Sequence, residues 1–115
     1  MLNFLYLFSA LIMAHFLFDY PLQGDFVAKF KARFVDGRHN NVWRWVLTAH
    51  AATHALPVLL ITKSLSLSLF MFLTHFFIDF LKCENKITFN QDQVYHLVVI
   101  LIISLVAHAN GVLLL

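Results

Sequence analysis

The chain has few charged residues and only one cysteine. Of its 115 residues, 12% are charged and 61% are hydrophobic, which is more apolar surface than a soluble domain of this size can bury. The composition excludes an ordinary soluble domain and predicts a single integral membrane domain, residues 1–115. Cys83 has no second cysteine to pair with, which excludes an intrachain disulfide. The formal net charge of +2 is too small to indicate a nucleic-acid partner.

The N-terminal segment lacks the marks of a cleaved signal peptide. It has neither a basic start nor a small-x-small cleavage site, and its apolar run contains His15 and Asp19. We expect it to remain as the first of several membrane helices, because about 20 apolar residues cross a bilayer. The apolar stretches predict an all-α bundle of four transmembrane helices at about 2–20, 42–62, 65–81 and 94–114.

The connection between the first two predicted helices has a pattern of its own. Phe26, Phe30 and Phe34 recur every four positions, with basic residues between them. This spacing predicts a short amphipathic helix at about 25–36 that lies in the membrane interface. The alternative is an ordinary solvated basic loop.

Basic residues are concentrated in two of the three connections. The first and third connections hold seven, whereas the second holds only Lys63. The positive-inside rule therefore predicts that the first and third connections face the cytoplasm. Both termini would then lie on the non-cytoplasmic side. The seven residues are Lys29, Lys31, Arg33, Arg38, Arg44, Lys82 and Lys86.

Two similar phrases stand sixty residues apart, HFLFDY at residues 15–20 and HFFIDF at residues 75–80. Each phrase places a His and an Asp four positions apart, and therefore on one face of a helix. The two halves of the chain would share one topology, which predicts an internal repeat about a pseudo-two-fold axis. The same spacing recurs in His50 with His54 and in Asp92 with His96.

These four polar pairs are predicted to meet at one level of the bundle. With a helix rise of about 1.5 Å per residue, they lie in the cytoplasmic half of all four helices. Imidazoles and carboxylates on facing helices form metal sites, and this donor set suits zinc, with manganese or iron as alternatives, as one or two ions. We expect no lysine or arginine in this layer, which favours a cation there. The candidate ligands are His15, Asp19, His50, His54, His75 and His96, and the candidate general bases are Asp79 and Asp92.

Each pair taken alone has a simpler explanation. A His and an Asp in a membrane helix often form a hydrogen bond between helices, and Asp92 could be a solvated helix cap. Chance placement would not be expected to give four pairs at the same depth. Their agreement therefore favours one shared functional site.

The same motifs carry a resemblance. The two phrases, with Gln23 and Asp25 after the first and Gln93 beside Asp92, resemble a family of short bacterial and phage membrane proteins known as domain of unknown function 3307. The resemblance covers nearly the whole chain and implies the fold and topology rather than an activity. A looser likeness to membrane-bound metal-dependent hydrolases, which also carry His and Asp in short membrane helices, implies hydrolysis by analogy.

The leading hypothesis is a metal-dependent hydrolase that acts on a lipid or lipid-linked phosphoester at the cytoplasmic leaflet. A bound metal would lower the pKa of water and polarise a phosphoryl oxygen. Basic residues of the first connection would attract anionic lipid headgroups. The residues expected at the entrance of the site are Gln23, Asp25, Lys29, Lys31, Arg33 and Arg44.

Two other classes of function remain open. The first is a transporter or sensor of metal ions or protons, but the half of the bundle facing the other side has few polar residues to line a path. The second is a non-enzymatic phage-type membrane protein whose polar layer is structural. Four helices suffice to enclose one site, and an oligomer is also open.

Overall fold

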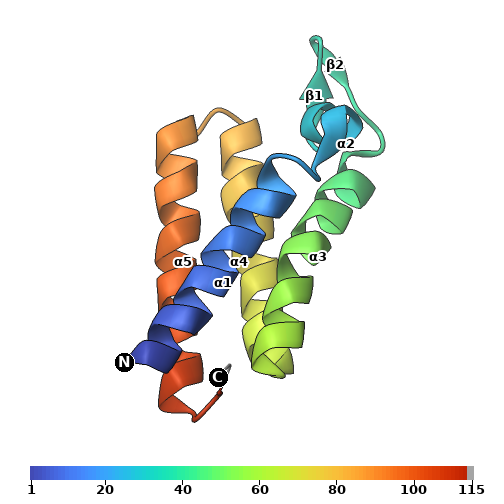
Figure 1. Ribbon diagram of the computed structural model, residues 1–115. Coiled ribbons are helices and arrows are strands. Elements are labelled where there is room, and N and C mark those ends of the chain that lie inside the picture. The colour runs from blue at the N-terminus through green and yellow to red at the C-terminus, as the bar shows by residue number, and fades with distance from the viewer. Residues whose placement is uncertain (114–115) are drawn as a thin grey trace.

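The structure is a computed structural model, and it describes residues 1–113. Four helices in this part are long and apolar enough to cross a membrane, which confirms the predicted all-α membrane bundle. A short helix and a two-stranded hairpin lie between the first two (Figure 1). The elements in chain order are α1 (Leu2–Asp19), α2 (Gly24–Phe30), β1 (Phe34–Val35), β2 (Arg38–His39), α3 (Trp43–Thr62), α4 (Leu65–Cys83) and α5 (Phe89–Ala109).

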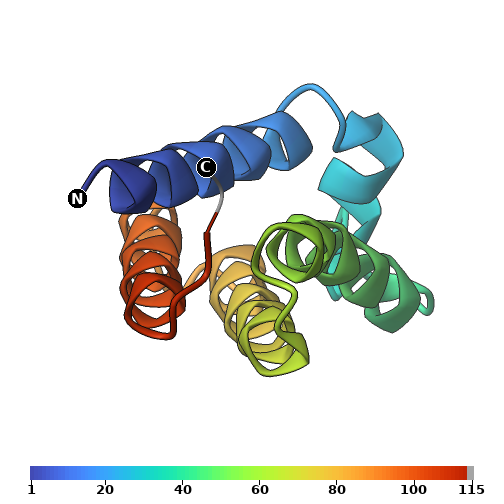
Figure 2. The same cartoon turned by 60° about the horizontal axis from the view of Figure 1, so that its bottom comes forward.

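The four long helices run alternately up and down, so that the start of α1 and the end of α5 lie at the same end of the bundle (Figure 1). Helix α3 packs on α4, α4 on α5, α5 on α1, and α1 on α3 (Figure 2). This cyclic order places α1 opposite α4, the two helices that carry the repeated phrases. The arrangement suits a pseudo-two-fold axis, and the internal repeat stays a prediction.

The last helix begins a turn and a half earlier than predicted. It starts at Phe89 rather than near 94, because Thr88 and Gln91 form a capping box. The Gln91 backbone N–H donates to the Thr88 hydroxyl at 3.1 Å, and the Thr88 N–H donates to the Gln91 side chain at 2.9 Å. Asp92 consequently lies inside the first turn of α5 and is fully buried, so it is not a solvated cap.

Loss of this cap should weaken α5 where it carries Asp92. Thr88→Ala removes the hydroxyl acceptor and is expected to lower the free energy of unfolding by about 1 kcal/mol. Thr88→Ser keeps the acceptor and serves as the control. Hydrogen exchange of the first-turn amides in detergent micelles checks the prediction, and equal protection in both variants would contradict it.

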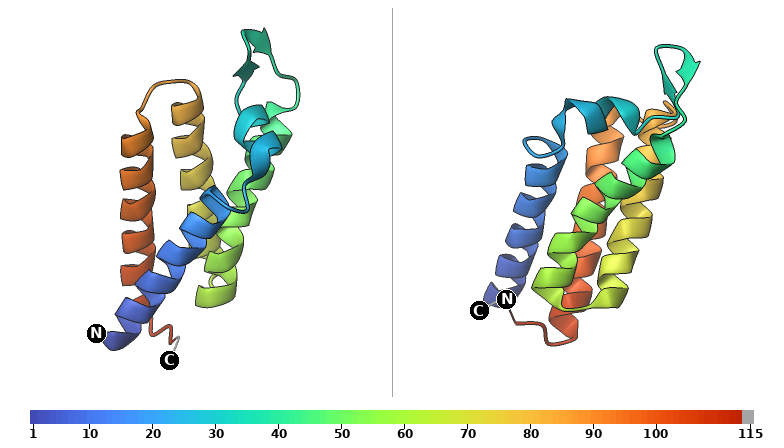
Figure 3. Two further views of the ribbon diagram at one scale, coloured as in Figure 1. Left: turned by 45° about the horizontal axis from the view of Figure 1, so that its top comes forward. Right: turned by 90° about the vertical axis from the view of Figure 1, so that its right-hand side faces the viewer.

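The predicted interfacial helix is too long. Helix α2 ends at Phe30, and the chain then turns into a hairpin in which Phe34 pairs with His39. The turn contains Asp36 at φ 51° and Gly37 at φ 78°, a left-handed conformation that ends any helix and favours glycine. The extension over residues 31–36 is therefore wrong. Helix α2 crosses the end of the bundle, and the hairpin projects beyond it (Figure 3).

The half of the bundle nearer the start of α1 and the end of α5 is filled mainly by apolar side chains. A cluster of apolar side chains from all four long helices lies there, each member at most 8% exposed. The hydroxyls nearby donate to backbone carbonyls of their own or a neighbouring helix: Thr62 to Val58, Ser68 to Ala55, and Ser104 to Ile100. We call this cluster the apolar plug: Leu11, Val58, Met71, Val99, Ile100 and Ile103.

Candidate metal centre

Eight polar side chains meet inside the bundle, two from each long helix. Because the members of a pair are four residues apart, each pair lies on the inward face of its helix. Every one of the eight is at most 9% exposed. We call them the His/Asp layer: His15 and Asp19 of α1, His50 and His54 of α3, His75 and Asp79 of α4, and Asp92 and His96 of α5.

Four members of the layer form the primary group, Asp19 with three histidines. One donor atom from each lies within 4.8 Å of the others. The Asp19 Oδ1 is 3.2 Å from His50 Nε2, 3.1 Å from His54 Nε2 and 4.0 Å from His75 Nε2. Donors bound to one tetrahedral zinc ion at about 2.0–2.2 Å stand about 3.3–3.6 Å apart. The primary group is therefore close to the spacing that a bound ion needs.

A second group shares Asp19 with the first and adds residues of α5. Donor atoms of Asp19, Asp92 and His96 also lie within 4.8 Å of one another. His15 is close to it, with Nε2 at 3.4 Å from Asp19 Oδ2. The structure thus brings together all six predicted ligands and both predicted bases.

Several buried ring nitrogens have no hydrogen-bond partner among residues 1–113. His75 is 0% exposed, yet neither of its ring nitrogens is hydrogen-bonded. Nε2 of His54 and of His96 each has a carboxylate oxygen within ion-pair distance, at 3.1 and 3.3 Å, but makes no hydrogen bond of good geometry. The three rings form a stack, with centroids 3.7 Å apart for His54 and His75 and 4.2 Å for His75 and His96. Unpartnered polar atoms are costly in an apolar interior, and a bound cation would satisfy them.

Two lysines reach the layer, so the expectation that it lacks basic residues is wrong. Lys31 is only 4% exposed, and its Nζ lies 2.8 Å from Asp79 Oδ2 and 2.6 Å from Gln23 Oε1. Lys82 Nζ lies 3.1 Å from Asp79 Oδ1 and 3.4 Å from Asp92 Oδ2. Lys31 directly follows α2, which crosses the end of the bundle (Figure 3). Its side chain is buried and contacts Asp79 of α4.

The lysines leave one carboxylate of the layer uncompensated. Asp79 and Asp92 have lysine partners, and three formal negative charges face two positive ones. Within the described part of the chain, Asp19 has only histidines within ion-pair distance. A buried carboxylate without a cation is unfavourable, so the charge balance favours a positive ion beside Asp19.

The six residues expected at an entrance lie in different places. Gln23 donates to the Asp19 carbonyl oxygen and accepts from Lys31, so these two lie at the end of the layer. The other four lie on the surface: Asp25 is exposed, Lys29 pairs with Asp36, Arg33 pairs with Glu84, and Arg44 lies over the Trp43 ring.

Gln93 belongs to the site, although residue spacing did not select it. Its Nε2 donates to Asp19 Oδ2 at 3.1 Å and to Asp92 Oδ2 at 2.9 Å, and its Oε1 lies 3.2 Å from His15 Nε2. It precedes His96 by three residues, and this helical spacing is the signal that could have placed it on the inward face.

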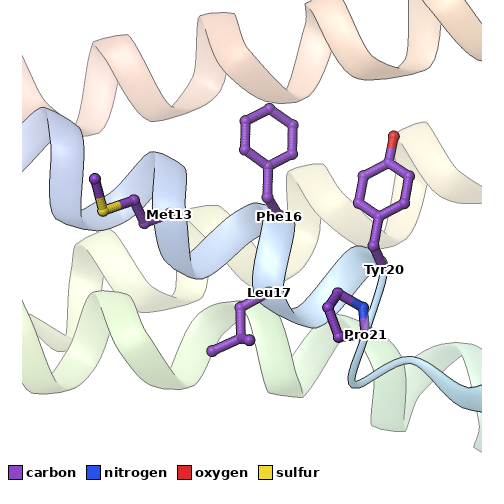
Figure 4. A pocket seen from close by; sticks show the side chains of 5 residues that line it. All are labelled: Met13, Phe16, Leu17, Tyr20 and Pro21. Atoms are coloured by element: carbon purple, nitrogen blue, oxygen red, sulfur yellow. The ribbon is translucent and has the colours of Figure 1, made fainter.

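The surface hollows of the described residues face outward. One between α4 and α5 has a volume of about 560 Å³, and another along α1 has about 390 Å³ and is lined by Met13, Phe16, Leu17, Tyr20 and Pro21 (Figure 4). Neither these two nor two smaller ones are lined by a residue of the His/Asp layer. The layer is enclosed by the four helices and capped by the α2 segment.

A family model described as a protein of unknown function, DUF3307, matches residues 7–114. The chain belongs to this family. The DUF3307 match spans the whole His/Asp layer and confirms the resemblance seen in the motifs. No curated protein and no solved structure matches the chain. Membership of this family implies no particular activity, because the family is described as one of unknown function. The likeness to membrane-bound hydrolases therefore stays a prediction.

Proposed function

We propose that this protein is a membrane-embedded metal-binding hydrolase that cleaves a lipid or lipid-linked phosphoester at the cytoplasmic leaflet. The primary group carries the proposal, because it gathers three imidazoles and one carboxylate within 4.8 Å of one another. Three or four such ligands are typical of zinc in proteins, and manganese and iron accept the same donors.

In the proposed site, Asp19, His50, His54 and His75 hold the ion. A bound divalent ion lowers the pKa of water towards neutrality and polarises a phosphoryl oxygen. Both candidate general bases are already engaged, Asp79 by two lysines and Asp92 by Lys82 and Gln93. We therefore assign neither carboxylate to accepting the proton.

Charge favours an anionic substrate. Lys31 and Lys82 bring two ammonium groups to the same end of the layer, and basic residues of the connections surround it on the surface. If that end faces the cytoplasm, as the positive-inside rule predicts, phosphate-bearing headgroups would be attracted to it. The termini would then face the other side of the bacterial inner membrane.

Transport of ions receives less support. The apolar plug fills the bundle between the His/Asp layer and the end with the termini, and the nearby hydroxyls are bonded to backbone carbonyls. A path across the membrane needs polar or ionisable groups along its length. Ion flux into liposomes that His75→Ala abolishes would favour transport over hydrolysis.

The first test is metal content followed by activity. The purified full-length protein is expected to contain at least one transition-metal ion per chain, and His54→Ala is expected to lose the ion of the primary group, because one of its four donors is gone. His108→Ala is the control, since His108 is exposed near the opposite end. Metal content is measured by inductively coupled plasma mass spectrometry.

Activity is then measured as phosphate released from a lipid phosphomonoester and a lipid pyrophosphate in mixed micelles. Release should depend on the ion and be lost in His54→Ala. Absence of metal from folded protein would contradict metal binding and favour a structural layer. Metal with no phosphate release from either lipid would contradict the hydrolase.

A further inference from the structure

We infer that Asp19 bridges two divalent ions, the second of which is bound by Asp92 and His96. The inference rests on the proposed function, because the first ion is the one proposed for the primary group. It adds a second metal site, which shares a single ligand with the first.

The two oxygens of the Asp19 carboxylate face different partners. Oδ1 faces the primary group, with His50 Nε2 at 3.2 Å and His54 Nε2 at 3.1 Å. Oδ2 faces the other way, with Gln93 Nε2 at 3.1 Å and His15 Nε2 at 3.4 Å. A carboxylate in this position can give one oxygen to each of two ions, as in di-metal sites built in the core of four-helix bundles.

The second group presents two donor atoms that lie within ion-pair distance of each other but are not hydrogen-bonded. Asp92 Oδ1 and His96 Nε2 lie 3.3 Å apart, and neither forms a hydrogen bond with any residue that the structure describes. The residues are 0% and 2% exposed, so both lie away from bulk solvent. The separation is about that of two donors on one ion of the first transition series, with bonds of about 2.0–2.2 Å. An ion between them would satisfy both atoms.

Gln93 shows that two carboxylates converge at this place. Its Nε2 donates to Asp19 Oδ2 and to Asp92 Oδ2, so one partly positive group lies between two acidic oxygens. Amide donation balances little of the carboxylate charge, whereas a divalent ion would balance it directly. The amide therefore holds the two carboxylates close enough for one ion to contact both.

The ammonium group of Lys82 provides the positive charge beside Asp92 that the second ion would provide when bound. Its Nζ is 3.4 Å from Asp92 Oδ2, and its side chain is 23% exposed near the end of α4. A long lysine side chain at the end of a membrane helix can reach towards the interface. Binding of the second ion should displace the ammonium group outward, so Lys82 competes with that ion for Asp92.

The inference is tested by counting ions in the full-length protein in detergent, with zinc chloride added and then removed by gel filtration. We expect two zinc ions per chain in the wild type and one in His96→Phe, a substitution that keeps a flat ring in the stack. His54→Phe should also keep one, because each histidine belongs to one group only. Manganese added in place of zinc should give the coupled electron paramagnetic resonance signal of two nearby ions, lost in both variants.

Lys82→Met allows an independent measurement of zinc affinity, because this substitution keeps all the proposed ligands of both sites. It should raise the zinc affinity of the second site by about tenfold, which is the scale of outer-shell effects on metal affinity, and leave the affinity of the primary site unchanged. Lys86→Met is the control, because Lys86 is exposed. If His96→Phe does not fold, Lys82→Met decides the question.

The outcomes separate the two proposals. One zinc ion in the wild type, with His96→Phe unchanged or Lys82→Met without effect, would overturn the bridged pair and leave the primary site standing. No zinc in the folded wild type would overturn the proposed function itself.

Discussion

Asp19→Asn is expected to abolish metal binding, with a loss of affinity of more than about 100-fold at both sites. Asp19 is the only residue that both groups share, and it is the carboxylate without a lysine. Loss of an outer-shell partner typically lowers metal affinity by about 10–100-fold, and loss of a direct anionic ligand should exceed that. Metal content by mass spectrometry and zinc titration measure the effect.

Asp19→Asn should not destabilise the protein when no metal is present, although it abolishes metal binding. Asparagine removes a buried charge that has no lysine or arginine within ion-pair distance among the described residues, so metal-free Asp19→Asn should be at least as stable as the metal-free wild type. Added zinc should then stabilise the wild type alone, because only a state that binds the ion gains from it. Asp36→Asn is the matched control, since Asp36 is exposed and lies in the hairpin turn. Zinc bound equally by Asp19→Asn and wild type would contradict the assignment of Asp19.

Lys31→Met is expected to destabilise the protein by about 3 kcal/mol, the lower end of the range for breaking a buried ion pair. It removes an ammonium group that is 4% exposed and lies 2.8 Å from Asp79, which is almost completely buried. The lower end applies because Asp79 keeps its contact with Lys82. The free energy of unfolding in mixed micelles measures the effect.

The control is Lys29→Met, two residues earlier. Lys29 pairs with Asp36 at 3.2 Å, but both side chains are largely exposed, and such pairs contribute about 0–1 kcal/mol. Adding Asp79→Asn to Lys31→Met should recover much of the lost stability, because the buried carboxylate that lost its Lys31 partner is then neutral. A Lys31→Met protein as stable as Lys29→Met would show that the Lys31–Asp79 pair does not hold the α2 segment on the bundle.

Helix periodicity was sufficient to place the layer residues. A spacing of four residues puts His15 with Asp19, and His75 with Asp79, on one face of a helix, and an apolar helix turns such a face inward. The spacing cannot say which donors of different helices come within bonding distance of one ion. That Asp19 meets His50, His54 and His75, whereas Asp79 meets two lysines, depends on how the four helices pack.

Two of the errors have a common physical origin. We predicted a helix over 25–36 and no lysine in the layer because the local sequence pattern of the first connection suggested a segment that lies wholly on the surface. In the structure the chain ends α2 at Phe30 and turns through Asp36 and Gly37, and the side chain of Lys31 enters the bundle. A lysine side chain is long enough to reach a buried carboxylate even when its position in the sequence suggests that it faces the surface.

Composition and spacing alone determined that the chain is a bundle of four membrane-length helices with an inward polar pair on each, because hydrophobicity and helix periodicity are properties of local sequence. Tertiary structure decided everything that depends on distance between helices. It divided the layer into two groups that share Asp19, paired Lys31 and Lys82 with the other carboxylates, brought in Gln93, and closed the opposite half with the apolar plug. Charge balance and metal geometry depend on contacts among residues far apart in the chain, and only folding brings those residues together.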